Sequence, residues 1–322
     1  MRRRHFETLQ PRCPLCRGAL SVDFEGDDLI EGIITCTGCR REYPVVDGIP
    51  ILVGPIRAWL AANPLQLLSR EDLTPALESL IGDVLGPGSQ YDTLRQHVGM
   101  YADDHYGGGG AAARLLDRAL DSSAADAPLL DVGCATGGTT FRLAEHGLTL
   151  GVDLNFAMLR LAASVLWDGK ARYARRRVGV VYDRVELDVD VATAESVDFW
   201  CCDASALPFR DGTFATVSSL NLVDCTPAPH QTLAETARVL RSGGRALIST
   251  PYDWSPAATP LEQWLGGHSQ RGGERGASEP SLRASLGDAF TIEREDNVPW
   301  RVRLHDRSAV EYDVHLAVAR RR

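Results

Sequence analysis

The chain has 322 residues, of which 44% are hydrophobic and 24% are charged, and its formal net charge is -9. Length and composition accommodate one full α/β domain with a small additional module, and they exclude disordered and fibrous classes. Because no apolar run reaches the about 20 residues of a membrane span and the basic residues 1–5 precede no apolar segment, we expect a cytoplasmic protein with no signal peptide and no membrane partner.

Four of the eight cysteines form two closely spaced pairs near the N-terminus, Cys13-x-x-Cys16 and Cys36-x-x-Cys39. The length of the segment between the pairs is typical of two knuckles that close one tetrahedral zinc site. In a reducing compartment, such pairs indicate a metal site rather than disulfides, the alternative being four unliganded core thiols. Four cysteine ligands leave zinc no open position, so the pattern predicts a structural Zn²⁺.

The segment after the second pair adds a specific tail, Tyr43-Pro44-Val45-Val46-Asp47-Gly48-Ile49-Pro50. With the cysteines, this tail makes residues 8–54 resemble the small zinc-ribbon activator of tRNA and release-factor methyltransferases and its bacterial single-domain relatives. The resemblance implies that residues 1–54 form a zinc-ribbon domain that supports a methyltransferase, here within one chain. Residues 55–88 show helical spacing of leucines with breaks at Asn63-Pro64 and 86–88, which predicts a helical connector.

A strand that runs into a glycine-rich turn is predicted at residues 129–138, followed by a helix over 139–146. The next strand, residues 148–153, ends in Asp153, where nucleotide-binding α/β folds hold a carboxylate against ribose hydroxyls. A dinucleotide-binding protein would share that acid. However, the acidic Asp131 precedes the turn and the Gly-x-Gly-x-x-Gly spacing is absent, so the cationic S-adenosylmethionine (SAM) fits better than a pyrophosphate.

Further strands are predicted at residues 197–203, 214–221 and 239–249, with a helix over 229–240 and a closing antiparallel pair at 290–294 and 310–319. This alternation predicts a Rossmann-like α/β fold whose parallel sheet binds its ligand at the carboxyl ends of the strands. Residues 89–322 resemble class I SAM-dependent methyltransferases. The resemblance implies that the glycine-rich turn lines the methionine moiety, Asp153 binds the ribose, and Asp203 and Ala204 flank the adenine. The full cofactor-binding set that we expect is Asp131, Gly133, Cys134, Ala135, Gly137, Asp153, Leu154, Asp203, Ala204 and Asn221.

Ala135 departs from that family, which usually has glycine at this position, and its methyl group should tighten the turn. The stretch between Asp153 and Asp203 is longer than one strand–helix–strand repeat needs, so we interpret residues 170–187 as an inserted β-like arm. The arm carries an arginine cluster, Arg172 and Arg175 to Arg177, that is either solvated surface or a phosphate contact. The acidic net charge disfavours a nucleic-acid substrate.

The segment after the last parallel strand contains Ser249-Thr250-Pro251-Tyr252-Asp253-Trp254 and then Thr259-Pro260-Leu261-Glu262-Gln263-Trp264. These elements resemble the mercaptohistidine N-methyltransferase domain of ovothiol biosynthesis, which implies a small histidine-like or other heteroaromatic substrate. An imidazole needs orientation and a group that holds its other ring proton. We therefore expect Asn221, Asp224 and Tyr252 to act in catalysis, beside an aromatic wall of Trp254 and Trp264.

Two other functions remain open at this point. The first is an RNA or protein methyltransferase that uses the zinc ribbon for recognition, and the second is a scaffold that binds SAM without catalysis. The histidines His105, His268 and His305 are expected to be surface or structural residues rather than catalytic ones.

Overall fold

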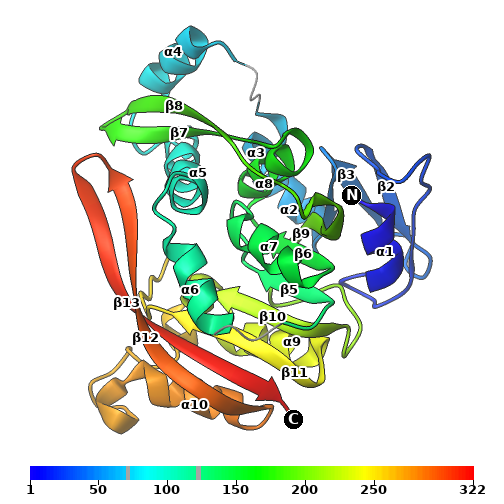
Figure 1. The fold of residues 1–322 in the computed structure, drawn as a ribbon, viewed down its shortest axis with the longest axis vertical. Helices are drawn as coiled ribbons and strands as arrows, with labels where there is room; N and C mark the ends of the chain where they lie inside the picture. Colours follow the sequence, from blue (N-terminus) through cyan, green and yellow to red (C-terminus); the bar gives the residue numbers. More distant parts are fainter. Residues whose placement is uncertain (70–72, 121–124) are drawn as a thin grey trace.

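Four parallel strands with almost entirely apolar, buried residues form the centre of the molecule: β5 (Leu129–Val132), β6 (Thr149–Asp153), β9 (Val197–Cys202) and β10 (Phe214–Leu220). Near-continuous apolar strands of this kind are covered by other elements on both faces. The computed structural model describes residues 1–69, 73–120 and 125–322. It confirms the Rossmann-like α/β fold, with an eleven-stranded sheet in the order β1-β2-β3-β4-β9-β6-β5-β10-β11-β13-β12 (Figure 1).

The helices that accompany the parallel strands are α7 (Gly138–Leu143), α8 (Phe156–Asp168) and α9 (Pro229–Val239), while α10 (Ser278–Gly287) precedes the final hairpin. The fifth parallel strand, β11 (Leu240–Thr250), pairs with β10 on one side and antiparallel with β13 on the other. Within the described residues, no helix is both long and apolar enough to cross a lipid bilayer.

The N-terminal strands do not form a separate sheet. They are β1 (Leu20–Ser21), β2 (Gly32–Cys36), β3 (Glu42–Val46) and β4 (Ile49–Leu52), and they are antiparallel to one another. β4 then pairs in parallel with β9, with Ile51 opposite Cys201 and Leu52 opposite Cys202. An unpaired β9 edge would expose backbone groups, and β4 covers it. The expected domain boundary at residue 54 therefore lies just after β4, which belongs to the continuous sheet.

The first helix, α1 (Arg3–Leu9), fixes the N-terminal module to the central strands. The buried His5 bonds through Nε2 to the carbonyl oxygens of Thr149 and Ser196, at 3.2 and 3.1 Å. The connector is helical as predicted, with α2 (Ile56–Ala62), α3 (Pro64–Leu68) and α4 (Pro75–Leu85), and the first break falls at Asn63. Arg160 of α8 holds α3 by donating to the Leu67 carbonyl oxygen at 2.9 Å.

Two long hairpins extend beyond the central sheet on the same side of the molecule (Figure 1). The inserted arm is confirmed as the hairpin β7 (Lys170–Val178) and β8 (Val181–Asp188). The closing pair is longer than predicted: β12 spans Phe290–His305 and β13 spans Ser308–Arg321. The prediction was too short because the outer half of β12 alternates charged and apolar residues, and its charges pair across the hairpin, as Arg301 does with Glu311.

Helix α5 (Gln90–Tyr106) lies between these two hairpins, while α6 (Ala111–Leu120) packs beside it. The break at residues 86–88 is followed by Ser89, whose hydroxyl caps α5 by accepting from the Asp92 N–H. Tyr182 of the arm donates to Asp92 at 2.7 Å, and Tyr173 donates to Asp103 at 3.1 Å. Gly99 lets α5 approach β7 closely, because a methyl group there would collide with the Ala174 carbonyl oxygen.

We predict that Gly99→Ala destabilises the protein by about 1–3 kcal/mol, because the added methyl group must push α5 away from β7. Urea unfolding followed by circular dichroism measures this change. Gly26→Ala is the matched control, because nothing lies within 4 Å of the added carbon there. An equal effect of the two substitutions would contradict the close packing of α5 on the arm.

Candidate functional site

A cavity of about 660 Å³ opens at the carboxyl ends of the central strands. The ends of β5, β6, β9 and β10 contribute its floor, as expected for an α/β sheet of this type. Residues of α2, α5, α6 and β12 form its other walls. No lysine or arginine is among the described residues that line it, whereas Asp131, Asp153 and Asp203 are. The cavity is therefore acidic at its floor.

The glycine-rich turn, residues 133–138, adopts a backbone conformation that is unfavourable for residues other than glycine. Gly133 and Gly137 have φ values of +76° and +89°, and Ala135 has +48°. The left-handed conformation costs a non-glycine residue about 1–2 kcal/mol, so the alanine that replaces the usual glycine is held in a strained state. Asp153 stabilises it, because its Oδ2 accepts the Ala135 N–H at 2.9 Å.

The aspartates at the strand ends are held by short hydrogen bonds. Asp131 accepts from the hydroxyls of Thr139 and Thr140 at 2.7 and 2.8 Å, which ties the end of β5 to α7. Asp153 also accepts from the Asn155 N–H at 2.8 Å. Burial raises the pKa of both carboxyls above the ordinary value of aspartic acid. Buried acids without a cation in the cavity wall favour a ligand that carries positive charge.

Most of the expected cofactor-binding residues line this cavity: Asp131, Gly133, Ala135, Asp153, Leu154, Asp203, Ala204 and Asn221. Cys134 and Gly137 are not among its lining residues. The Cys134 side chain is 1% exposed, and burial raises the pKa of its thiol, so it is a core residue beneath the turn. Gly137 is the part of the turn that packs against the core, where an added methyl carbon would be 2.7 Å from Phe199.

Of the three expected catalytic residues, only Asn221 faces the cavity. It has φ +53°, and its Oδ1 accepts from the Ser249 hydroxyl at 2.9 Å, while its amide N–H groups have no acceptor among the described residues. Asp224 is buried and binds Thr250 Oγ1 and the Asp253 N–H, so it stabilises the turn after β11. Tyr252 points toward β13, where its hydroxyl lies 2.6 Å from His315 Nδ1. Contrary to expectation, neither Asp224 nor Tyr252 lines the cavity, and a catalytic role for them stays a prediction.

The expected aromatic wall of Trp254 and Trp264 is also corrected. These indoles stack on each other with ring centroids 5.9 Å apart, and neither lines the cavity. The aromatic side chains that do line it are Trp59 of α2, Tyr101 of α5 and Trp300 of β12. Trp300 stacks on Tyr312 at 5.4 Å, so the final hairpin supplies a rigid flat surface to the cavity.

Helix α5 supplies residues that the sequence analysis missed. His97, Tyr101 and His105 follow one another at intervals of four and line the cavity together with Met100. This spacing on a polar helix was the available signal, since residues four apart share one helix face. His105 is therefore a cavity residue, while His268 is exposed as expected.

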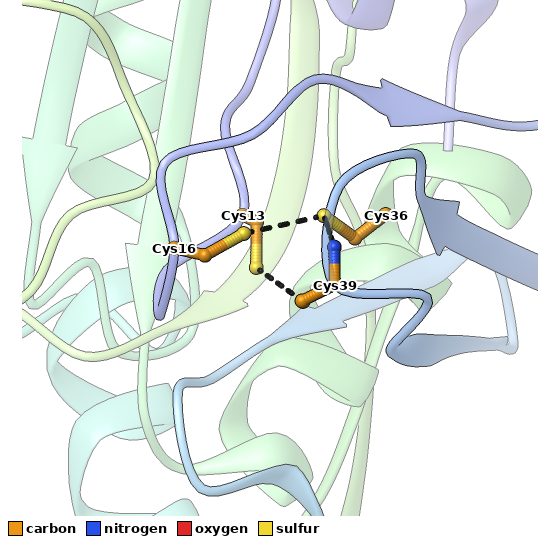
Figure 2. A group of neighbouring side chains, drawn as sticks. All are labelled: Cys13, Cys16, Cys36 and Cys39. Atoms are coloured by element: carbon orange, nitrogen blue, oxygen red, sulfur yellow. Dashed lines mark hydrogen bonds between the residues drawn. The ribbon is translucent and has the colours of Figure 1, made fainter.

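The four paired cysteines converge at one point in the N-terminal module (Figure 2). Their sulfur atoms all lie within 4.8 Å of one another, with Cys13 to Cys39 at 3.8 Å and Cys16 to Cys36 at 3.5 Å. Zn–S bonds of about 2.3 Å in a tetrahedron place sulfur atoms about 3.8 Å apart. The donor set and its spacing therefore fit a structural Zn²⁺, and Tyr43 adds a hydroxyl 3.1 Å from Cys13 Sγ.

Two family models match separate parts of this chain. Residues 130–248 match the methyltransferase domain model, and residues 6–48 match the Trm112p-like protein model. The chain is 30% identical over 174 residues to the phosphatidylethanolamine N-methyltransferase of Cereibacter sphaeroides, covering 50% of this chain and 80% of that protein. It is 39% identical over 51 residues to a UPF0434 protein of Photobacterium profundum, covering 16% of this chain and 78% of that protein. A solved chain from a complex of the Haloferax volcanii Trm112 methyltransferase activator aligns at 16% identity with a TM-score of 0.45, covering 71% of this chain and 97% of that one.

The parallel sheet, the glycine-rich turn and the acids at the strand ends define a class I methyltransferase, an enzyme that takes its methyl group from SAM. The chain belongs to the SAM-dependent methyltransferases and carries a Trm112-like module at its N-terminal side.

We predict one zinc ion per chain in the purified protein, by elemental analysis. Cys13→Ser should lower both the zinc content and the thermal stability, because three sulfur ligands hold the ion less tightly and the module loses its cross-link. Cys225→Ser is the control, since Cys225 lies outside the cluster. A zinc-free wild-type protein, or equal zinc in both variants, would refute the metal site.

Proposed function

We propose that this enzyme transfers the methyl group of SAM to a nitrogen of a small histidine-like or other heteroaromatic substrate. The cavity is the observation that carries this proposal. It combines acids at three strand ends with walls of aromatic side chains, and no lysine or arginine is among the described residues that line it. Its volume of about 660 Å³ lies within the about 300–1,000 Å³ of small-molecule sites. A polymer substrate would need an extended surface instead.

For the cofactor, we propose that Asp153 accepts hydrogen bonds from the ribose hydroxyls and that Asp203 and Ala204 flank the adenine. The glycine-rich turn, with Gly133 and Ala135 facing the cavity, would hold the methionine end. SAM supplies an electrophilic methyl group next to a sulfonium, and the acidic floor suits that positive charge. The protein then mainly orients the nucleophile and excludes water.

For the substrate, we propose that a flat ring lies against Trp300 and Tyr101, beside the side-chain amide N–H groups of Asn221. A neutral imidazole nitrogen attacks the methyl carbon, and the proton on the other ring nitrogen then needs an acceptor. Burial lowers the pKa of His97 below that of free histidine, which favours the neutral ring, whose unprotonated nitrogen is the acceptor that we propose. No hydrogen-bond partner of His97 is found within the described part of the chain, which leaves the ring available.

The alternative is an RNA or protein methyltransferase, and the Trm112-like module is the observation that favours it. The arginine cluster of the arm gives it less support, because its guanidinium groups already bond within the protein and three of the four pair with carboxylates. Arg172 pairs with Asp168 and Glu186, and Arg175 and Arg177 pair with Asp183. Arg176 donates to Gln96 and to the Gly179 carbonyl oxygen.

The cytoplasmic setting expected from the sequence stays a prediction.

We predict that calorimetry detects binding of S-adenosylhomocysteine and that Asp153→Asn weakens it by about tenfold or more, because a charged acceptor for the ribose is lost. The control is Asp188→Asn, whose side chain is 90% exposed on the arm. If Asp153→Asn and Asp188→Asn bind the ligand equally well, Asp153 has no role in the cofactor site. Absence of binding to the wild-type protein would remove the whole proposal.

A second experiment separates the two substrate classes. We predict methyl transfer from SAM to free histidine or its ring-substituted derivatives, detected by mass spectrometry, and no transfer to bulk RNA. The double variant Arg175→Glu, Arg176→Glu should keep the same rate on the small substrate. Transfer to RNA alone, abolished by that double variant, would establish the alternative function instead.

A further inference from the structure

His105 contacts the glycine-rich turn directly from α5. Its Nδ1 lies 3.0 Å from the Gly138 N–H nitrogen and 3.0 Å from the Thr136 hydroxyl. A ring nitrogen that accepts a backbone N–H carries no proton, so the neutral ring must carry its proton on Nε2. Burial lowers the pKa of His105 to about 4, and the ring is therefore neutral at physiological pH. Within the described residues, Nε2 has no hydrogen-bond partner, although His105 lines the cavity.

The backbone of the turn offers few donors of its own to a ligand. The N–H groups of Gly133 and Cys134 bond to the Val152 carbonyl oxygen, and that of Gly137 bonds to the Cys134 carbonyl oxygen. The Ala135 N–H bonds to Asp153, and the Gly138 N–H bonds to His105. The hydroxyls of Thr139 and Thr140 donate to Asp131. These groups are thus occupied within the protein.

The methionine end of SAM carries a carboxylate as well as positive charges. A carboxylate that leaves water must find hydrogen-bond donors, and a buried anion without them is costly. The described cavity lining contains no lysine or arginine, and its three aspartates repel an anion. A neutral histidine whose N–H faces the cavity beside the turn meets this requirement.

We propose that His105 donates its Nε2–H to the carboxylate of the bound cofactor while its Nδ1 holds the glycine-rich turn. This inference rests on the proposed cofactor site and assigns one residue within it. His105 acts as a binding and positioning residue, since it links the position of the carboxylate to the backbone at Gly138. Tyr101 lies one helical turn away and lines the same cavity, so its hydroxyl is the competing donor.

The test compares two ligands that differ only in the carboxylate: S-adenosylhomocysteine and its decarboxylated analogue. Calorimetry gives the dissociation constant of each with the full-length, zinc-loaded protein. His105→Asn keeps an acceptor near the position of Nδ1 but removes the Nε2 donor, whereas His105→Gln restores an N–H near Nε2. We expect the wild-type protein to favour the carboxylate-bearing ligand by about tenfold or more.

His105→Asn should bring the ratio of the two dissociation constants close to one while leaving the affinity for the decarboxylated analogue almost unchanged, and His105→Gln should recover part of the ratio. Such a cycle isolates the contact from any general loss of affinity. A ratio that is unchanged in His105→Asn overturns the inference, as does a ratio that is lost only in Tyr101→Phe. If the wild-type protein binds neither ligand, the proposed cofactor site itself is wrong.

Discussion

The turn between β5 and α7 must hold a left-handed backbone, including the strained Ala135, against the tendency of the chain to relax. Two elements hold it, β6 and α5. Asp153 at the end of β6 accepts the Ala135 N–H, and α5 contributes both His105, which accepts the Gly138 N–H, and Tyr106, which donates to the Thr136 carbonyl oxygen at 2.5 Å. The shape of the cavity floor depends on these contacts, because Gly133 and Ala135 of the turn line the cavity.

The N-terminal module is joined to the same site through the sheet. β4 pairs with β9, and the register places Leu52 opposite Cys202, the residue before Asp203. Without β4, the β9 strand would lie at an open edge, and its end would be free to fray. The buried His5 and the four-cysteine cluster fix the module that carries β4. We therefore regard the module as a brace for the strand that ends at Asp203.

The sequence was sufficient to locate every central strand and the acids that end them, because buried parallel strands give continuous apolar runs and their last residues share one edge. It was also sufficient for the four-cysteine cluster, whose spacing in the sequence is short and regular. It could not place side chains that follow a strand end. Asp224 and Tyr252 both lie just past parallel strands, yet local turn bonds direct Asp224 into the core and Tyr252 toward β13.

The cavity walls were the least predictable part, since they come from elements far away in the chain. Trp300 reaches the cavity only because the β12–β13 hairpin is long enough. The charged residues in the outer half of the hairpin made the strands look shorter in the sequence. Likewise, His97 and Tyr101 line the cavity because α5 is packed between two hairpins. Trp254 and Trp264 were expected to form an aromatic wall of the site, but they stack on each other inside a loop.

We infer that SAM lies in one cavity at the carboxyl edge of the sheet, with its nucleoside at Asp153 and Asp203 and its amino-acid end beside the glycine-rich turn. A crystal structure of the protein with S-adenosylhomocysteine tests it most directly. We expect ligand density between Asp153 and Asp203, with the amino-acid end beside His105. Ligand bound elsewhere, or with its amino-acid end directed away from the turn, would contradict it.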